Sequence, residues 1–168
     1  MTRGRVTHVA VTADPIEASA LLARVGDAAD GAQLLFLGTV RDHNDGRPVR
    51  GVLYETYQAM AEEVLEQVAE EAAAQLRGGS LAVVHRVGEL AIGEVSVAIA
   101  VSSPHRAEAY QASRYVIEEI KKRLPVWKQE RYLDGDQRWL PGHDPAAEAT
   151  SGRRGTGQGT GQDTGEAA

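Results

Sequence analysis

The clearest structural signal in the chain is EVSVAIAVSSPHRAEAYQASRYVIEEIKKRLPVWK, residues 94–128. Large apolar residues alternate with small ones from 94 to 102, which predicts a strand that is buried on both faces. Ser103-Pro104 favours the start of a long helix. Pro125 ends this helix at about Leu124, because the residue before a proline avoids the helical region. A second strand follows the proline, so the stretch predicts a helix that packs on a sheet.

Strand and helix patterns alternate through the rest of the chain. Apolar runs predict strands at 6–11, 33–40, 49–57 and 81–86, and a hairpin that pairs 126–133 with 137–140. Helices are predicted at 58–77 and after Asp14-Pro15, where Asp14 would cap the helix, Pro15 would open it and Gly26 would end it. Residues 42–46 have the chemistry of a turn. These elements predict an α+β domain of two layers.

The composition is that of a globular protein with an acidic balance. Of the 168 residues, 42% are hydrophobic and 25% are charged, and the net charge is -6. Nucleic-acid binding needs a basic face, so we expect no nucleic-acid partner. The lack of cysteine excludes disulfides, thiolate metal sites and a cysteine nucleophile. Apolar runs are shorter than the ~18 residues that span a bilayer, and no signal-peptide core is seen, so we expect a cytoplasmic protein without membrane contact.

The composition changes after Leu140. Residues 141–168 have no aliphatic or aromatic side chains beyond alanine and proline, and they are rich in Gly, Thr and Gln. Such a segment cannot bury enough area to offset the entropy lost on ordering it. We therefore predict one folded domain at 1–140 and a disordered Gly/Thr/Gln-rich tail at 141–168.

Lysine is rare and clustered in this chain. There are fifteen arginines and three lysines, and the lysines are Lys121, Lys122 and Lys128. Lysine can be tuned to lose its proton, whereas arginine cannot, so lysine suits a base or a nucleophile. Pro125 bends the chain between Lys121 and Lys128 and can bring them together. The alternative is that cations at a helix C-terminus only favour the macrodipole.

Other cationic residues stand at the ends of predicted elements. His105 and Arg106 follow a buried strand at a helix N-terminus, where free N–H groups and a guanidinium suit an anion. The alternative is a capped helix with an exposed arginine. These observations predict one cationic pocket for an anionic ligand, formed by Arg41, His105, Arg106, Lys121 and Lys128.

Some polar and aromatic residues suggest structure more than chemistry. Asp42, His43 and Asp45 lack a second ligand cluster elsewhere, so no metal site is predicted. His85-Arg86 is interpreted as structural or interfacial. Trp127 and Trp139 are predicted to be core or interface anchors.

Several motifs resemble the family of molybdopterin synthase catalytic (large) subunits. They are VRDHNDG at 40–46, LYETY at 53–57, HRVGEL at 85–90, GE at 93–94, HR at 105–106, and the segment 121–130. They follow the family's order and spacing over about residues 6–140, which makes the match specific. The departures are Tyr110, Glu118 and Gln129, and of these Gln129 lowers the local charge. The resemblance implies an α/β hammerhead-type domain with an additional small antiparallel β subdomain.

The resemblance also implies an activity and partners. A small ubiquitin-like sulfur-carrier subunit would bring a C-terminal Gly-Gly thiocarboxylate into the pocket. Two sulfurs would then pass to cyclic pyranopterin monophosphate and form the dithiolene of molybdopterin, in molybdenum cofactor biosynthesis. This sulfurtransferase would use no cofactor or metal of its own, and it would form a homodimer within a heterotetramer.

Residue by residue, the resemblance places catalytic roles on Lys121 and Lys128. The implied substrate contacts come from three stretches and are Thr39, Val40, Arg41, His105, Arg106, Lys121, Lys128, Gln129 and Glu130. Two other functions stay open, a non-catalytic docking module for a ubiquitin-like tail and a sensor of a phosphorylated metabolite. The sequence does not say which lysine performs which step.

Overall fold

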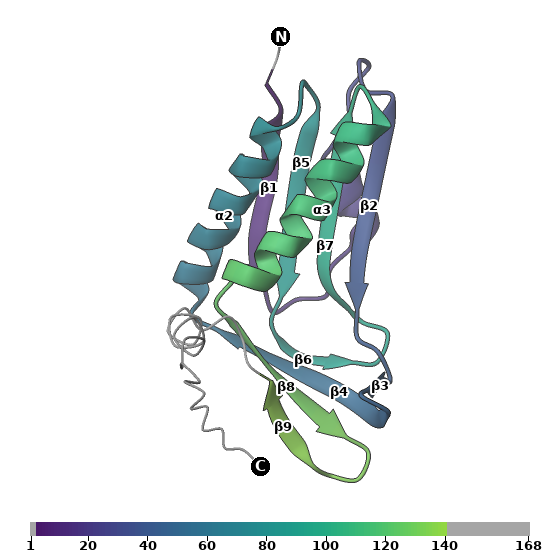
Figure 1. The fold of residues 1–168 in the computed structure, drawn as a ribbon, viewed down its shortest axis with the longest axis vertical. Helices are drawn as coiled ribbons and strands as arrows, with labels where there is room; N and C mark the ends of the chain where they lie inside the picture. The colour runs from purple at the N-terminus through teal and green to yellow at the C-terminus, as the bar shows by residue number, and fades with distance from the viewer. Residues whose placement is uncertain (1–2, 141–168) are drawn as a thin grey trace, which may run out of the picture.

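The structure is a computed structural model that describes residues 3–140. The predicted disordered tail, 141–168, lies outside the described residues. The described part contains two β-sheets and three helices (Figure 1). This confirms the α+β architecture expected from the sequence. No helix within residues 3–140 has the length and apolar character needed to cross a membrane.

The first sheet has four strands in the order β1-β5-β7-β2. Strands β1 and β5 are parallel, and the other neighbours are antiparallel. The central β7 is buried from its second residue to its last, as its alternating pattern predicted. The strands are β1 (Arg5–Thr12), β2 (Ala32–Thr39), β5 (Ser80–Arg86) and β7 (Val95–Ser103).

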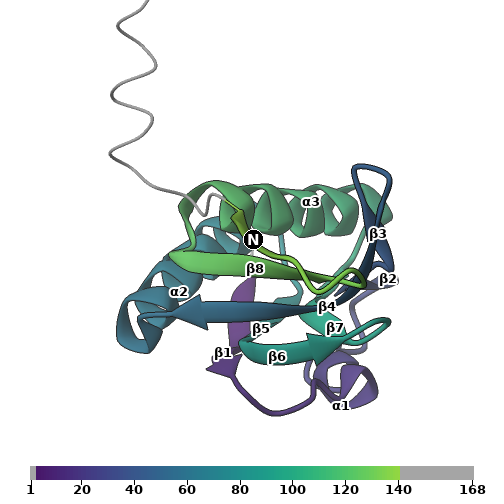
Figure 2. The same cartoon turned by 90° about the horizontal axis from the view of Figure 1, so that it is seen from below.

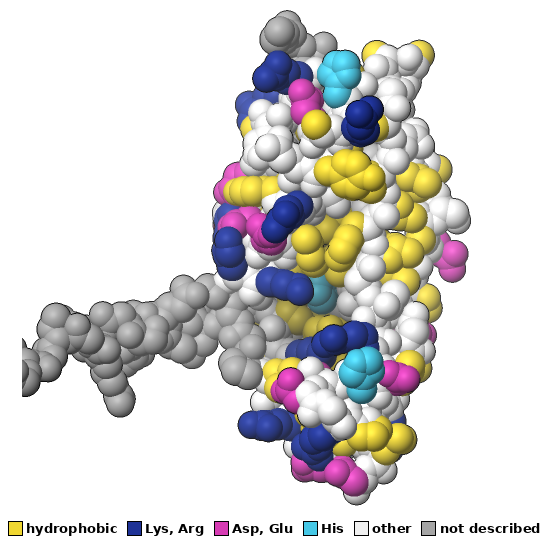
Figure 3. All heavy atoms as spheres, turned by 45° about the vertical axis from the view of Figure 1, so that its right-hand side comes forward, with side chains coloured by type: hydrophobic (Ala, Val, Ile, Leu, Met, Phe, Trp, Pro, Cys, Tyr) yellow, Lys and Arg dark blue, Asp and Glu magenta, His cyan; other side chains and the backbone are white. Residues whose placement is uncertain are grey.

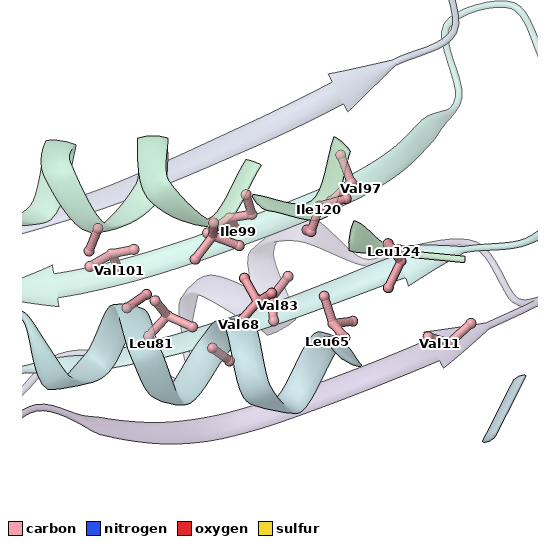
Figure 4. Close-up of a cluster of buried hydrophobic side chains, with 14 of the residues drawn as sticks. Val11, Leu65, Val68, Leu81, Val83, Val97, Ile99, Val101, Ile120 and Leu124 are labelled. Atoms are coloured by element: carbon pink, nitrogen blue, oxygen red, sulfur yellow. The ribbon is translucent and has the colours of Figure 1, made fainter. Parts of the chain in front are cut away.

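Helices cover both faces of the first sheet (Figures 1 and 2). The long helices α2 (Gln58–Ala74) and α3 (Arg106–Arg123) lie on one face, and the short α1 (Ala18–Leu22) lies on the other. The main core lies under α2 and α3 (Figure 4), where Leu65 and Ile99 have no exposed surface. Burying an aliphatic side chain of this size contributes roughly 1.5–3 kcal/mol.

The second sheet crosses the end of the first sheet where β1, β5 and β2 finish (Figures 1 and 2). Its strand β4 lies between β6 and β8, β8 pairs with β9, and all these pairs are antiparallel. This sheet is the small antiparallel β unit that the resemblance implied. Its strands are β3 (His43–Asn44), β4 (Arg47–Thr56), β6 (Gly88–Ala91), β8 (Val126–Tyr132) and β9 (Gln137–Leu140).

Four helix boundaries differ from the prediction, and one of them is the end of α1, which lies at Leu22 and not next to Gly26. Glu17 occupies the N-cap position of α1 without a capping hydrogen bond from its side chain, so Asp14 is not the cap. The Asp14 amide instead donates to Thr12 Oγ1 at 3.0 Å. Helix α3 begins at Arg106 because Ser103 still pairs with Ala32 in the sheet. Helix α2 ends at Ala74, three residues before the predicted end at 77.

Neither tryptophan belongs to the core. Trp127 is 36% exposed and Trp139 is 47% exposed, so the core role expected for them is wrong, and the other expected role, an interface anchor, stays a prediction. Trp127 instead meets the ring of Tyr57 edge to face, with centroids 5.7 Å apart. Both tryptophans lie in the second sheet, which has too few covering elements to bury large side chains on both faces.

Candidate functional site

A pocket of about 510 Å³ lies where the two sheets and the C-terminal end of α3 meet. We call it the junction pocket. The first sheet contributes a row of three residues that are paired across neighbouring strands: Gly38 of β2, Val97 of β7 and His85 of β5. All three line the junction pocket. Helix α3 and the second sheet complete the lining with Ile117, Ile120, Lys121, Leu124, Tyr54, Val126, Lys128 and Leu140.

Lys121 and Lys128 line the same pocket, as the bend at Pro125 suggested. Leu124 is extended, with φ -70° and ψ 121°, so the helix ends there and the chain reverses into β8. The Pro125 carbonyl accepts a hydrogen bond from Thr56 Oγ1 at 2.6 Å, which fixes this bend against β4. The hairpin-like reversal therefore holds both amines at one site.

Arg41 and Lys121 bring uncompensated positive charge to the junction pocket. Both are exposed, both line the pocket, and neither forms an ion pair with any residue in 3–140. Basic side chains gather on this face below an apolar surface (Figure 3). The site therefore suits an anionic group.

Lys128 is held differently, by a buried carboxylate. Its Nζ lies 3.0 Å from Oε1 of Glu130, which is 1% exposed. Glu130 Oε2 accepts hydrogen bonds from Asn44 Nδ2 at 2.9 Å and from the Tyr132 hydroxyl at 2.7 Å. Burial raises the pKa of Glu130, but these hydrogen bonds and Lys128 outweigh it, so the pKa lies below its usual value. Lys128 and Glu130 thus form an ion pair without net charge.

His85 lines the junction pocket, although the sequence interpretation gave it a structural or interfacial role. It follows Leu81 and Val83 on the helix-covered face of β5, because alternate strand residues share a face. The core ends at Val83, so the imidazole reaches the pocket while staying 6% exposed. Burial lowers the pKa of His85 to about 4, so the ring is neutral at pH 7. A histidine at a strand end, inside the HRVGEL motif, was the signal that could have indicated it.

His105 and Arg106 are not in the junction pocket of their own chain. They lie at the N-terminal end of α3, whereas Lys121 lies in its last turn. Fifteen residues of helix at 1.5 Å each separate Arg106 from Lys121 by roughly 22 Å. The single five-residue pocket predicted from the sequence is therefore divided within one chain, because a straight helix holds its ends apart.

The remaining predicted residues take different positions around the pocket. Thr39 lines it, and Val40 is buried in a small cluster beneath it with Val52. Gln129 lies between Lys128 and Glu130 on β8, so its side chain points to the opposite face of the strand.

The fold and the pocket define an α+β domain with two sheets and, at their junction, a cationic pocket that suits an anionic ligand. Residues 11–123 match the family described as MoaE protein. The molybdopterin synthase catalytic subunit of Bacillus subtilis (strain 168) is 42% identical over 130 residues, which are 77% of this chain and 82% of that protein.

Solved structures agree with this match. Molybdopterin synthase from Staphylococcus aureus is 36% identical, with a TM-score of 0.74, and the match covers 79% of this chain and 96% of that chain. A chain from the complex of subunits 1 and 2 of molybdopterin-converting factor from Helicobacter pylori 26695 shares the fold at 20% identity, with a TM-score of 0.60, over 79% of this chain and 89% of that one. The chain belongs to the MoaE protein family. It is a catalytic subunit of molybdopterin synthase type, a transferase that adds sulfur in molybdenum cofactor biosynthesis.

Proposed function

We propose that the junction pocket is where sulfur passes from the C-terminal Gly-Gly thiocarboxylate of a small ubiquitin-like carrier subunit to cyclic pyranopterin monophosphate. Both reactants are anionic. The observation that supports this is the pair of uncompensated cations, Arg41 and Lys121, in one pocket with the ion-paired Lys128. Anions are attracted strongly to guanidinium and ammonium groups that have no carboxylate partner.

The charges suggest different roles for the two lysines. Lys121 and Arg41 are free to bind the thiocarboxylate or the phosphate. Lys128 already has Glu130 as a partner, so its role in this proposal is to support charge and proton transfer during sulfur attack. The carrier sulfur displaces an oxygen substituent from a side-chain carbon of the pterin, and water then cleaves the acyl–sulfur bond and returns the carrier as a carboxylate.

The assembly is part of the same proposal. The solved Helicobacter pylori structure is a complex of two different subunits, which supports a partner for this chain. Strand β2 is one of the two edge strands of the first sheet and exposes Phe36 and Leu37, and α3, which packs beside it, exposes Tyr110. This apolar surface lies between the junction pocket and Arg106, so a second copy related by a two-fold axis would carry its own Arg106 and His105 toward this pocket. We therefore propose a homodimer within a heterotetramer, in the cytoplasm.

Reconstitution tests this function. The purified chain, a thiocarboxylated carrier and cyclic pyranopterin monophosphate are mixed, and the dithiolene product is measured. We expect wild type to form product and Lys121→Ala to lose at least about 100-fold in rate while still binding the carrier. Lys122→Ala is the matched control, because Lys122 is exposed and pairs with Glu119 at 3.2 Å.

The alternative functions give different results. A wild-type chain that binds the carrier but forms no product would identify a docking module. A chain that binds the pterin phosphate and ignores the carrier would identify a metabolite sensor.

A further inference from the structure

His85 places a neutral hydrogen-bond acceptor in the junction pocket. Its Nδ1 lies 2.9 Å from the backbone carbonyl oxygen of Arg86. A carbonyl oxygen only accepts, so Nδ1 carries the hydrogen and Nε2 keeps its lone pair. No residue between 3 and 140 forms a hydrogen bond to Nε2.

The orientation of the ring is fixed by its surroundings. Tyr54 meets the imidazole edge to face, with centroids 5.5 Å apart and planes at 86°. His85 is 6% exposed and lines the pocket, so the exposed part of a nearly buried side chain faces the ligand space. The ring cannot turn without giving up its bond to the Arg86 carbonyl.

An acceptor of this kind complements the rest of the pocket. Arg41, Lys121 and Lys128 can only donate hydrogen bonds, and Glu130 is already occupied by three donors. Hydroxyl groups such as Thr39 can donate or accept, so they do not discriminate between ligand groups. His85 Nε2 only accepts in this tautomer, so it rejects a ligand that presents an acceptor at the same point.

We propose that His85 Nε2 accepts a hydrogen bond from a ring N–H or O–H group of the pterin substrate and so orients the ring beside the lysines. The proposal rests on the function proposed above and adds a specificity-determining residue to it. The cations would bind the anionic ends of the reactants, and His85 would select the heterocycle.

Two substitutions separate the two ring nitrogens. His85→Asn keeps an amide N–H near the Nδ1 position, where it can still donate to the Arg86 carbonyl, and removes the acceptor. His85→Gln reaches the Nε2 position with its amide oxygen and restores an acceptor there. Loss of one such hydrogen bond should raise KM for the pterin about 10-fold in His85→Asn with a smaller change in kcat, and His85→Gln should recover most of it.

Binding measurements distinguish recognition of the ring from recognition of the anion. We expect His85→Asn to weaken binding of cyclic pyranopterin monophosphate about 10-fold and to leave inorganic phosphate binding unchanged. Equal weakening of both ligands, or wild-type KM in both variants, would overturn the proposal. His8→Asn, on β1, is the control for a histidine outside the pocket.

A measurement on the wild type covers the case in which a variant does not fold. With ¹⁵N-labelled histidine, the Nε2 resonance of His85 should move upfield when the pterin phosphate binds and should stay in place with inorganic phosphate. An unchanged resonance in the pterin complex contradicts the proposal. Failure of the proposed function appears separately, as a wild-type chain that forms no dithiolene.

Discussion

Glu130→Gln should lower the free energy of unfolding by about 2–3 kcal/mol at pH 7. Glutamine has one acceptor oxygen, and Asn44 and Tyr132 both donate to the same oxygen of Glu130. If the glutamine oxygen stays there, its NH₂ group faces the Lys128 ammonium, and a charge-assisted bond of about 1.5–3 kcal/mol is lost. The two remaining hydrogen bonds weaken from charged to neutral. Relief from burying a carboxylate charge offsets part of this loss.

Urea unfolding of both proteins between pH 7 and pH 3.5 measures this difference. The folded-state pKa of Glu130 lies below its ordinary value of 4.5, so its contribution is complete above about pH 5.5 and falls as the pH drops through the folded pKa. The difference in free energy of unfolding between wild type and Glu130→Gln should therefore become smaller as the pH falls. Glu118→Gln, in the exposed pair with Arg114, is the control and should change stability little. Equal stability of wild type and Glu130→Gln at pH 7, or a gap independent of pH, would refute this account of the network.

Three further changes test the core, the pocket lining and the buried histidine. Leu65→Ala should lower the free energy of unfolding, measured with urea, by about 2–5 kcal/mol, because Leu65 has no exposed surface and its removal leaves a cavity. A decrease below about 1 kcal/mol would show instead that the core closes around the cavity. Gly38→Ala should lower stability by about 1–3 kcal/mol and raise KM, since its Cβ would lie 2.6 Å from Val97 Cγ1, and unchanged values of both would contradict this packing. The free energy of unfolding of the wild type should fall by about 3 kcal/mol between pH 6.5 and pH 4. The reason is that His85 is protonated in the unfolded chain over this range, whereas the folded ring, with a pKa of about 4, stays neutral. In His85→Asn the free energy of unfolding should depend less on pH over this range. An unchanged pH dependence would show that a group other than His85 causes it.

Most of the fold could be predicted because its strands and helix ends have local causes. The alternation in β7 and the proline after α3 act within a few residues, so sequence patterns describe them well. Strand β6 (Gly88–Ala91) has no such pattern and is a strand because β4 lies beside it. The start of α3 was misplaced for the same kind of reason, since the partner strand keeps Ser103 in the sheet.

The part of the site with a local cause in the sequence is the pair of lysines, whereas Arg41 was placed beside them from its charge and its position at a strand end. Lys121 and Lys128 are separated by one bend, so their convergence followed from Pro125. His85 and Tyr54 are in contact because the second sheet crosses the end of the first sheet. No local sequence pattern predicts such a crossing, so this contact could not be predicted. Within one chain His105 and Arg106 lie apart from the lysines, because the helix between them sets a distance that residue type does not reveal.

The charges of the junction pocket limit how many reactants it can hold under the proposed function. Arg41 and Lys121 contribute two uncompensated positive charges, and Lys128 and Glu130 cancel each other. A thiocarboxylate and a cyclic phosphate each carry a single negative charge near neutral pH, so one carrier tail and one substrate balance the pocket. A second tail bound at the same time would add an anion without a partner among this chain's own pocket residues, and burying an unpaired charge is costly. We therefore expect the two sulfurs to arrive in succession, with the first carrier leaving before the second binds.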